Sequence, residues 1–284
     1  MRTFPPLIAR PSRPAVMGVL NVTPDSFSDG GAFERPDPRA RSEAALARAE
    51  ELLGLGADLI DVGGESTRPG AGRVPQAEEA ARVLPVVRAL AERGVPVSVD
   101  TMYARTAAEA LAAGARMIND VSGGMADPDM LPVLAEHDTP FVLSHWRGHS
   151  IVMDGLADYA DPAREIAEEL ARARDAATAR GLRPERIVLD PGLGFAKRPE
   201  HNWAVLRELD RFLALGHPLL IGHSRKRFLG ELLAPGAPVA ERDLPSAIVS
   251  ALCARRGVWG LRVHDVAATA VALDVVDHWR GGTA

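Results

Sequence analysis

The sequence lacks the features of several large protein classes. Its 284 residues include one cysteine, Cys253, which excludes an internal disulfide and is typical of a reducing compartment. No apolar run approaches the roughly 20 residues that span a bilayer. The formal net charge of −5 gives no basic surface for a nucleic acid or an anionic membrane. We therefore expect a cytoplasmic protein whose partners are small molecules, with no nucleic acid and no membrane among them.

Lysine is also scarce, because only Lys197 and Lys226 occur among 33 basic residues. The ammonium of lysine is a compact point charge, whereas the guanidinium of arginine is a planar group, so the two cannot always replace each other. In a chain whose cations are almost all arginines, a remaining lysine therefore suggests a position that requires an ammonium. The alternative is that both lysines are chance surface residues. Lys226 lies between Arg225 and Arg227, which favours a role for Lys226, and we expect Lys197→Ala to matter much less than Lys226→Ala.

Short apolar segments alternate with longer segments of helical periodicity along the chain. Several apolar segments follow a helix-ending glycine, and they lack clean polar alternation, as expected of parallel strands buried on both faces. The predicted strands are 15–21, 57–63, 95–101, 115–121, 140–145, 186–190, 218–222 and 260–264. Eight such units predict an α/β fold, a single (β/α)8 TIM barrel over 15–284 behind a loose N-terminal leader, 1–14. A doubly wound open sheet is the alternative.

Each predicted strand closes on or near a polar residue. Capping of the following helix explains part of this pattern. It does not explain the glycines and cations that accompany it, nor a histidine directly after an arginine-bearing strand. Ligands bind at the C-terminal mouth of such a barrel, so we place the functional site there. The polar residues are Asn21, Asp61, Asp100, Asn119, His145, Asp190, Ser224 and His264.

Cations gather after the last two predicted strands. Residues 224–227 read SRKR, and Arg262 and His264 lie on the same side of the final strand because they are two residues apart. The loops after strands seven and eight form the usual phosphate pocket of these barrels, and a guanidinium, an ammonium and a hydroxyl suit a phosphate or diphosphate. For SRKR alone, a solvated charge run is the alternative.

Two acids and an amide end three other strands, at Asp100, Asn119 and Asp190. Inside an apolar barrel these groups need donors, and a flat heterocycle with amino and ring N–H groups supplies them. Lys226 would then face the carbonyl oxygen or a ring nitrogen of that heterocycle. Helix caps, or partners of buried arginines, are the alternative for each residue taken singly.

Two long loops rich in glycine, proline and serine, 21–31 and 63–73, follow the first two strands and suggest active-site covers. The sequence has no dinucleotide fingerprint, no Walker or H-E-x-x-H motif and no cysteine and histidine cluster, so we expect no tightly held transition metal. Asn21 could contact a Mg²⁺ ion that keeps most of its waters and bridges a ligand diphosphate. No serine has a histidine at a readable spacing, so we expect no covalent nucleophile.

Seven segments in the same order resemble the dihydropteroate synthase family of folate biosynthesis. They are MGVLNVTPDSFSDGG, DVGGESTRPGA, VSVDT, MINDVSGG, LDPGLGFAK, GHSRKRFLG and RVHDV, and they extend from Met17 to Val266. The resemblance implies a transferase that condenses 6-hydroxymethyl-7,8-dihydropterin pyrophosphate with p-aminobenzoate, giving 7,8-dihydropteroate and pyrophosphate. It also implies a Mg²⁺ cofactor. The second segment has no evident insertion, so we expect sulfonamides to compete with p-aminobenzoate.

The resemblance also implies roles for individual residues. The catalytic residues are expected to be Asp100, Lys226, Arg262 and His264. The pterin site comprises Asp100, Asn119, Asp190 and Lys226. The pyrophosphate site comprises Asn21, Arg262 and His264, with Asn21 as the metal ligand. The p-aminobenzoate site and its covering loops comprise Thr67, Arg68, Pro69, Phe195, Ser224, Phe27 and Asp25.

A dissociative substitution at the pterin methylene carbon suits these groups, because cations neutralise the departing pyrophosphate and no protein nucleophile is required. One alternative is a methyltetrahydrofolate methyltransferase of the same barrel family, which needs neither the diphosphate cations nor the covering loops. The other is a pterin-binding paralogue without turnover. Ser144 and His223 depart from the family pattern, and we expect them to affect substrate affinity more than activity.

The family resemblance further suggests a homodimer through the last helices. Apolar residues there could form the interface, or they could instead pack on the barrel. They are Ile248, Leu252, Val271 and Val275.

Overall fold

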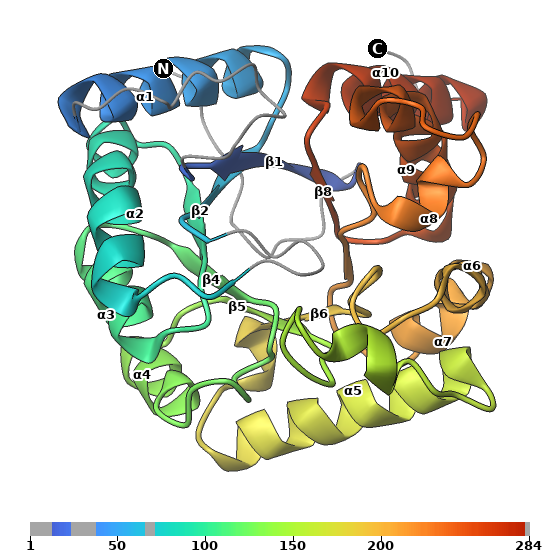
Figure 1. Ribbon diagram of the computed structural model, residues 1–284, viewed down its shortest axis with the longest axis horizontal. Helices are drawn as coiled ribbons and strands as arrows, with labels where there is room; N and C mark the ends of the chain where they lie inside the picture. The colour runs from blue at the N-terminus through green and yellow to red at the C-terminus, as the bar shows by residue number, and fades with distance from the viewer. Residues whose placement is uncertain (1–12, 24–37, 66–71, 282–284) are drawn as a thin grey trace.

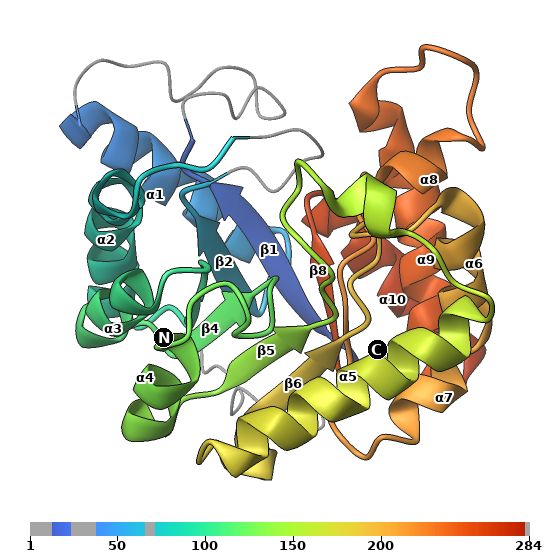
Figure 2. The same ribbon diagram turned by 60° about the horizontal axis from the view of Figure 1, so that its bottom comes forward.

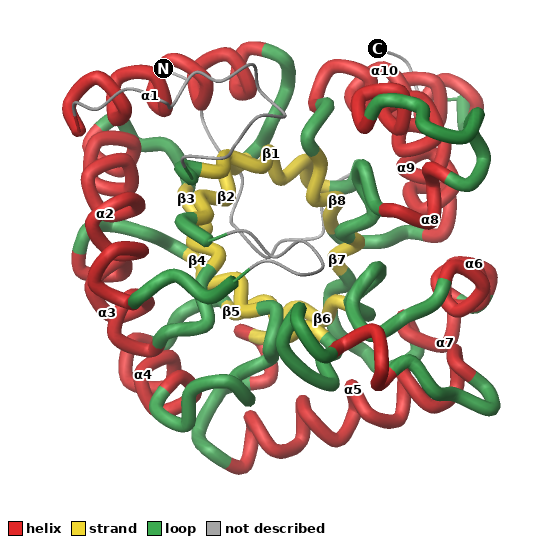
Figure 3. Tube along the Cα trace, in the orientation of Figure 1, coloured by secondary structure: helices red, strands yellow, loops and turns green. Residues whose placement is uncertain are grey.

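The computed structural model describes residues 13–23, 38–65 and 72–281, so most of the predicted leader lies outside it. Eight parallel strands form a ring that is surrounded by helices (Figures 1 and 3). The strands follow the order β6-β5-β4-β3-β2-β1-β8-β7, and a parallel bridge between Leu189 and Leu219 joins the two ends of this order. The predicted (β/α)8 barrel is confirmed, and the open-sheet alternative is wrong.

Each strand lies within its predicted segment. The short, β-branched segments form strands because both of their faces are buried, one against the helices and one inside the barrel. The strands are β1 (Ala15–Asn21), β2 (Leu59–Gly63), β3 (Val97–Asp100), β4 (Met117–Asp120), β5 (Phe141–Ser144), β6 (Ile187–Asp190), β7 (Leu220–Ile221) and β8 (Gly260–Val263).

Helices fill the intervals between the strands, and α5 runs along the outside of β5 and β6 (Figure 2). None of the helices in the described part of the chain has the length and apolarity needed to cross a bilayer. The α-helices are α1 (Pro38–Gly54), α2 (Gln76–Glu92), α3 (Ala104–Ala112), α4 (Met130–His137), α5 (Pro162–Ala179), α6 (Pro199–Arg207), α7 (Leu209–Leu213), α8 (Arg227–Gly230), α9 (Asp243–Arg256) and α10 (Val266–Trp279). The short 3₁₀ helices are η2 (Met153–Leu156), η3 (Pro184–Arg186) and η4 (Val239–Arg242).

Glycines end several helices before the next strand, as the sequence predicts. Gly114 follows α3 with φ of 104°, a left-handed conformation that suits glycine, and a Cβ placed there would lie 2.6 Å from the Cβ of Ala91. Gly114 therefore fixes both the turn into β4 and the close approach of α2.

The alternation of side chains along each strand determines what faces the barrel interior. Leu59, Met117 and Val188 belong to an apolar cluster drawn from β1, β2, β4, β5, β6 and β7, which lies inside the barrel. Their neighbours Ile60 and Ile118 belong instead to the cluster shared with the helices. Because the period of a strand is two residues, the residue two positions after each inward apolar side chain also faces inward.

A polar layer therefore lies above the apolar layer, towards the C-terminal ends of the strands. Asp61, Asn119 and Asp190 each follow an inward apolar residue by two positions, and all three are buried. Asp100 ends β3, Arg262 precedes the last residue of β8, and a hydrogen bond joins their side chains. Four of the eight strand-end residues that the sequence singles out thus converge on one mouth, namely Asp61, Asp100, Asn119 and Asp190.

Candidate active site

The interior of the mouth contains a guanidinium between two carboxylates. Arg262 Nε donates to Asp61 Oδ2 at 2.6 Å, and Arg262 Nη2 donates to Asp100 Oδ2 at 2.7 Å. Asp61 is fully buried, and Asp100 is nearly so. Burial raises the pKa of Asp100 to about 7, and the charge of Arg262 acts in the opposite direction. These side chains therefore hold one another in a charged layer that water barely reaches.

Asp61 also orients the amide of Asn119. Asn119 Nδ2 donates to Asp61 Oδ2 at 3.0 Å, and both residues are buried. Because an ionised carboxylate only accepts hydrogen bonds, the amide must turn its NH2 group towards Asp61 and keep its carbonyl oxygen as an acceptor for a ligand. Asp61 was predicted to lie at a strand end, but no role was predicted for it. The sequence signal that could have placed it inside the barrel is its position two residues after Leu59 on β2.

Asp190 ends β6, and one of its carboxylate oxygens accepts a hydrogen bond from the loop that follows. Asp190 Oδ1 accepts from the backbone N–H of Gly192 at 2.7 Å. Its Oδ2 lies 3.5 Å from the position that a Cβ on Gly222 would occupy, so the missing side chain at Gly222 keeps space beside this oxygen. Burial raises the pKa of Asp190, and the bond from Gly192 opposes that change.

Lys226 lies over the ring of Phe195. Its Nζ is 3.9 Å from the ring centroid, a distance typical of a cation–π contact. A Cβ on Gly194 would lie 2.8 Å from Cδ of Lys226, so this glycine, with φ of 77°, provides the space for the lysine stem. Burial and then the neighbouring charge of Arg262 lower the pKa of Lys226 to about 8, while Asp190 and Asp100 oppose the change.

Ser224 and His264 form a pair at the ends of the last two strands. Ser224 Oγ accepts from the backbone N–H of His264 at 3.1 Å and lies 3.1 Å from its Nδ1. The hydroxyl can donate to Nδ1 in the tautomer whose ring proton lies on Nε2. Asp265 caps the helix that follows directly, because its side chain accepts from the backbone N–H of Ala268.

Asn21 and Asp100 lie on either side of Gly63. A Cβ on Gly63 would lie 3.3 Å from Oδ1 of Asn21 and 3.6 Å from Cβ of Asp100. The absent side chain therefore lets β1 and β3 present their terminal polar groups to the same part of the mouth.

The sequence SRKR does not form one cluster of cations. Arg225 has φ of 57° and donates from Nε and Nη2 to the two carboxylate oxygens of Asp243, at 2.7 and 2.8 Å. Arg227 is exposed and pairs with Asp154 at 3.4 Å. Ser224 contacts His264 and Lys226 contacts Phe195, whereas Arg225 and Arg227 pair with carboxylates of other segments.

Five predicted site residues belong to the two long loops, and they lie outside the described residues. They are Asp25, Phe27, Thr67, Arg68 and Pro69.

Lys197 is buried, which contradicts the surface interpretation of this lysine. Its Nζ donates to the carbonyl oxygens of Gly192 and Phe195 at 2.9 and 3.0 Å, and it lies 3.0 Å from Nδ1 of His145. Burial lowers the pKa of Lys197 to about 7, and the charge of Asp190 opposes this change. The sequence analysis missed this position because nothing local to the chain brings β5 and the loop after β6 together.

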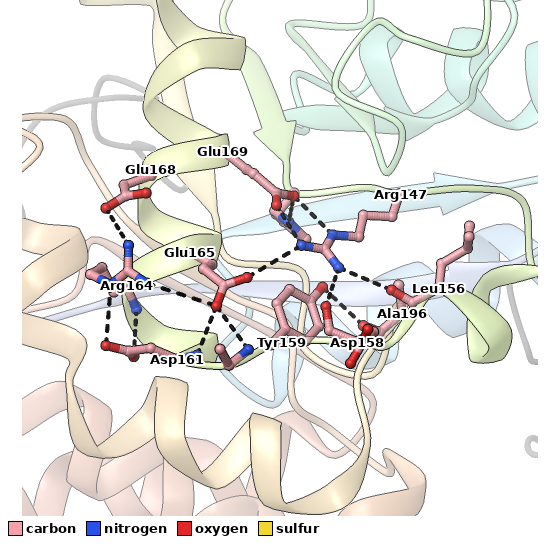
Figure 4. A network of polar contacts seen from close by, with 12 residues as sticks. Arg147, Leu156, Asp158, Tyr159, Asp161, Arg164, Glu165, Glu168, Glu169 and Ala196 are labelled. Carbon is pink, nitrogen blue, oxygen red and sulfur yellow. Dashed lines mark hydrogen bonds and ion pairs between the residues drawn. The ribbon is translucent and has the colours of Figure 1, made fainter.

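His145 contacts Glu169 of α5. Glu169 in turn belongs to a network of polar contacts around Arg147 (Figure 4). Glu169 Oε2 lies 2.8 Å from His145 Nε2 and accepts from Nε of Arg147 at 3.0 Å. The guanidinium carbon of Arg147 lies 3.8 Å from the ring centroid of Tyr159. Burial lowers the pKa of His145 to about 4, so this ring is neutral at physiological pH.

No group of three or more histidine, cysteine or carboxylate side chains within the described ranges is arranged to hold a metal ion. Asn21 Oδ1 is a single hard oxygen at the mouth, which suits a Mg²⁺ ion that takes its other ligands from water and substrate. The described residues therefore fit a metal that arrives with a phosphate ligand and do not fit a cage built from protein.

Comparisons with known proteins identify the family of this chain. A profile of the pterin binding enzymes matches residues 17–264. The chain is 49% identical over 269 residues to the dihydropteroate synthase of Mycobacterium leprae, with 93% of each chain covered. It is 43% identical over 270 residues to that of Synechocystis, covering 94% of this chain and 91% of the relative.

Two solved structures are similar over almost the whole chain. Dihydropteroate synthase of Xanthomonas albilineans with 4-aminobenzoic acid has a TM-score of 0.86 and 42% identity, covering 96% of this chain and 95% of that chain. The enzyme of Yersinia pestis in a sulfonamide drug complex has a TM-score of 0.87 and 40% identity, covering 95% of both chains.

The chain belongs to the pterin binding enzymes. Within that family it belongs to the dihydropteroate synthases, which are transferases of folate biosynthesis. The relatives favour neither the methyltransferase nor the paralogue without turnover.

Proposed function

We propose that the mouth of this barrel binds 6-hydroxymethyl-7,8-dihydropterin pyrophosphate and p-aminobenzoate and joins them, releasing pyrophosphate. The observation that carries the proposal is the polar layer at the mouth, in which Arg262 joins Asp61 and Asp100 and Lys226 lies over the ring of Phe195. A solved relative is described with 4-aminobenzoic acid and another with 7,8-dihydropteroate, which supports the same pair of ligands here.

The pterin is held by acceptors on one side and a donor on the other. Asp190 Oδ2 and the carbonyl oxygen of Asn119 are acceptors for the amino and ring N–H groups of the pterin. Lys226 donates to the carbonyl oxygen or a ring nitrogen, and its contact with Phe195 fixes the position of the ammonium. Asp100 completes the site and keeps a negative charge beside the ring.

The diphosphate binds beside those N–H groups of Arg262 that do not donate to Asp61 or Asp100. Arg262 uses Nε and Nη2 for two carboxylates, and a guanidinium has five N–H groups in all, so Nη1 can donate to a phosphate oxygen. His264 Nε2 and the side-chain amide of Asn21 add further donors. These groups are placed to neutralise the charge that develops on the leaving oxygen.

Asn21 would hold Mg²⁺ as one of several ligands, and the bound ion would supply further neutralisation of the diphosphate. The other ligands would be substrate oxygens and water, because no group of three or more histidine, cysteine or carboxylate side chains in the described part of the chain could hold an ion.

The substitution proceeds by loss of the leaving group before attack. The bond between the pterin methylene carbon and the diphosphate oxygen breaks, and its electron pair leaves with pyrophosphate. The cation at the methylene carbon is delocalised into the dihydropterin ring, where the carboxylate of Asp100 stabilises it. The amine nitrogen of p-aminobenzoate then forms the new C–N bond and loses a proton to solvent. Orientation in the closed site makes this weak nucleophile effective.

The binding site for p-aminobenzoate borders the pterin site on the side of Phe195 and Ser224. The ring of Phe195 offers an apolar face to the aromatic substrate, and Ser224 offers a hydroxyl. The covering loops contribute Asp25, Phe27, Thr67, Arg68 and Pro69 to this proposal.

We also propose that the protein is a homodimer through α9 and α10. Four apolar side chains on these helices are each more than half exposed, so the alternative that they pack on the barrel is wrong. Burial against a second copy would remove this apolar area from water. The residues are Ile248, Leu252, Val271 and Val275.

The cytoplasm is the proposed location. Cys253, the one cysteine of the sequence, is a buried free thiol. Burial raises its pKa to about 12, so the thiol stays protonated and unreactive in a reducing compartment.

Pyrophosphate release tests the function. The chain is supplied with the pterin pyrophosphate, p-aminobenzoate and Mg²⁺, and release is followed continuously. We expect Lys226→Ala to lower kcat/KM for the pterin substrate by about a hundredfold to a thousandfold. Arg227→Ala, a change in the neighbouring exposed cation, is the matched control and should change it little. Absence of release from the wild-type chain, or equal losses in both variants, would contradict the proposal.

Sulfonamides give a second test at the p-aminobenzoate site. We expect a sulfonamide to raise the KM for p-aminobenzoate with kcat unchanged, because both compounds occupy the same pocket. Unchanged turnover at saturating drug and low p-aminobenzoate is the contrary result.

A further inference from the structure

The loop between β6 and α6 connects two parts of the candidate site. Asp190 lies at its start and Phe195 near its end, and Lys226 rests on the ring of Phe195. The conformation of this loop therefore decides where a pterin acceptor and the ammonium lie relative to each other.

The backbone of this loop has a conformation that needs support. Gly192, Gly194 and Ala196 all have positive φ, of 67°, 77° and 46°. For the glycines this is ordinary, but for Ala196 it is unfavourable, because Cβ crowds the backbone in the left-handed region. Surrounding contacts must hold such a segment in place.

Lys197 supplies the central contacts. Its ammonium has three N–H groups and faces three acceptors, the carbonyl oxygens of Gly192 and Phe195 and Nδ1 of His145. The close packing of the loop on β5 leaves no room for adjustment, since a Cβ on Gly192 would lie 2.4 Å from the carbonyl oxygen of His145.

The two residues whose carbonyl oxygens Lys197 binds also contact the site through their other groups. Gly192 accepts from Lys197 through its carbonyl, and its N–H donates to Asp190 Oδ1, which turns Asp190 Oδ2 towards the interior. The carbonyl of Phe195 fixes the residue whose ring contacts Nζ of Lys226. One ammonium thus sets both an acceptor and a donor for the pterin.

The acceptor on the other side of Lys197 is itself fixed. Neutral His145 donates from Nε2 to Glu169, so Nδ1 is left as an acceptor directed at the ammonium. Glu169 is held by the guanidinium of Arg147 (Figure 4). Helix α5 on the outside of the barrel therefore supports the ammonium inside it.

We propose that Lys197 is a positioning residue for the pterin site, acting through the loop that carries Asp190 and Phe195. This role rests on the proposed function, because the groups that it positions are those assigned to the pterin. Lys197 itself donates to protein atoms and forms no contact with the reacting groups. Lys226 remains the lysine with the larger effect on activity.

Removal of the ammonium at constant side-chain length is the main test. We expect Lys197→Met to lower kcat/KM for the pterin pyrophosphate by about ten- to a hundredfold, because small displacements of positioned groups have effects of this size. The dissociation constant of the pterin, followed by its fluorescence, should rise in parallel. Lys197→Arg should recover part of the loss. Tyr159→Phe, which removes the hydroxyl that donates to Ala196 of the same loop, is the matched control and should have a smaller effect.

Coupling to Phe195 separates positioning from general destabilisation. If Lys197 acts through Phe195, the effects of Lys197→Met and Phe195→Ala on kcat/KM combine to less than their product. A lowered Tm with kcat/KM and pterin affinity within about twofold of wild type, or effects that multiply as independent changes, would overturn the inference. If Lys197→Met does not fold, His145→Gln, which changes one of the three acceptors, carries the same test.

Pterin binding also separates this inference from the proposed function. A wild-type chain that binds the pterin but releases no pyrophosphate contradicts the proposed reaction. In that case the pterin affinity of Lys197→Met, compared with that of wild type, still decides whether Lys197 positions the site.

Discussion

Replacement of Arg262 by methionine tests the charged layer most directly. The variant leaves Asp61 and Asp100 facing each other without the cation between them, and Asp61 has no exposure to water. Removal of one partner from a buried ion pair costs about 3 to 5 kcal/mol. Because 17% of the Arg262 side chain is exposed, some solvent screening remains, and we expect a loss near the lower figure, about 3 kcal/mol near pH 8. For 284 residues this corresponds to a fall in Tm of about 5 °C.

The loss should depend on pH in a definite direction. The folded pKa of Asp100 is about 7, above its ordinary value of 3.8, and removal of Arg262 takes away a charge that holds it down. Between these values the native state of the variant binds a proton that the unfolded chain does not bind. Its stability therefore rises as the pH falls through 7, because protonation of Asp100 removes the repulsion from Asp61.

Urea unfolding near pH 8 and near pH 5.5 is the assay, with wild type measured beside each variant. The stability deficit of Arg262→Met should shrink by up to about 1.4 kcal/mol at the lower pH, because the variant binds a proton between pH 8 and the wild-type pKa of about 7, and below that pKa Asp100 is protonated in both proteins. Arg93→Met is the control, because the pair of Arg93 with Glu50 is exposed and should contribute about 0 to 1 kcal/mol at either pH. A deficit that is the same at both pH values, or no larger than that of the control, would refute the assignment of a buried triad.

Three further outcomes are expected. The ammonium of Lys226 loses its proton as the pH rises through its lowered pKa of about 8, so kcat/KM for the pterin substrate should fall above that pH. The residual kcat/KM of Lys226→Arg should not show this fall, because the guanidinium keeps its proton. Burial raises the pKa of Glu79 to about 7, so the ionisation of this acid destabilises the native state progressively as the pH rises from 4.5 to 7. In urea unfolding, Glu79→Gln should therefore be more stable than wild type by about 2 to 3 kcal/mol near pH 8.5. The two proteins should not differ in stability near pH 4. Leu252→Glu should convert the dimer to a monomer in sedimentation equilibrium and leave the far-ultraviolet circular dichroism unchanged, whereas a wild-type chain that sediments as a monomer contradicts the dimer.

The barrel could be predicted because its signals are local. A segment such as 15–21 is apolar on both faces, and a glycine such as Gly114 ends the helix before the next strand, so the eight units can be recognised one at a time. The convergence of Asp100, Asn119 and Asp190 follows from the same pattern, because parallel strands present their C-terminal ends at one edge. Spacing within each strand was sufficient to place these side chains inside.

The partners of the site residues could not be predicted in the same way. Asp61 and Arg262 are 201 positions apart in the sequence, and their hydrogen bond depends on the register of β2 and β8 on either side of β1. No role could be assigned to Lys197, because its acceptors are His145, directly after β5, and two carbonyl oxygens of the loop after β6. Arg225 was misread because its own left-handed backbone turns it to Asp243 on α9.

The guanidinium of Arg262 connects the proposed pterin site to the proposed diphosphate site. Arg262 reaches both Asp61 and Asp100 with only part of its donor set, so the carboxylates that face the ring and the donors that face the leaving group belong to one rigid assembly. In the proposed reaction, breaking of the C–O bond would move negative charge to the diphosphate side of Arg262 and create positive charge on the ring side beside Asp100. The protein dipole formed by Asp100 and Arg262 already has the opposite orientation to this charge separation. Little reorganisation is therefore needed during the reaction, which is the condition under which fixed charges lower a barrier most effectively.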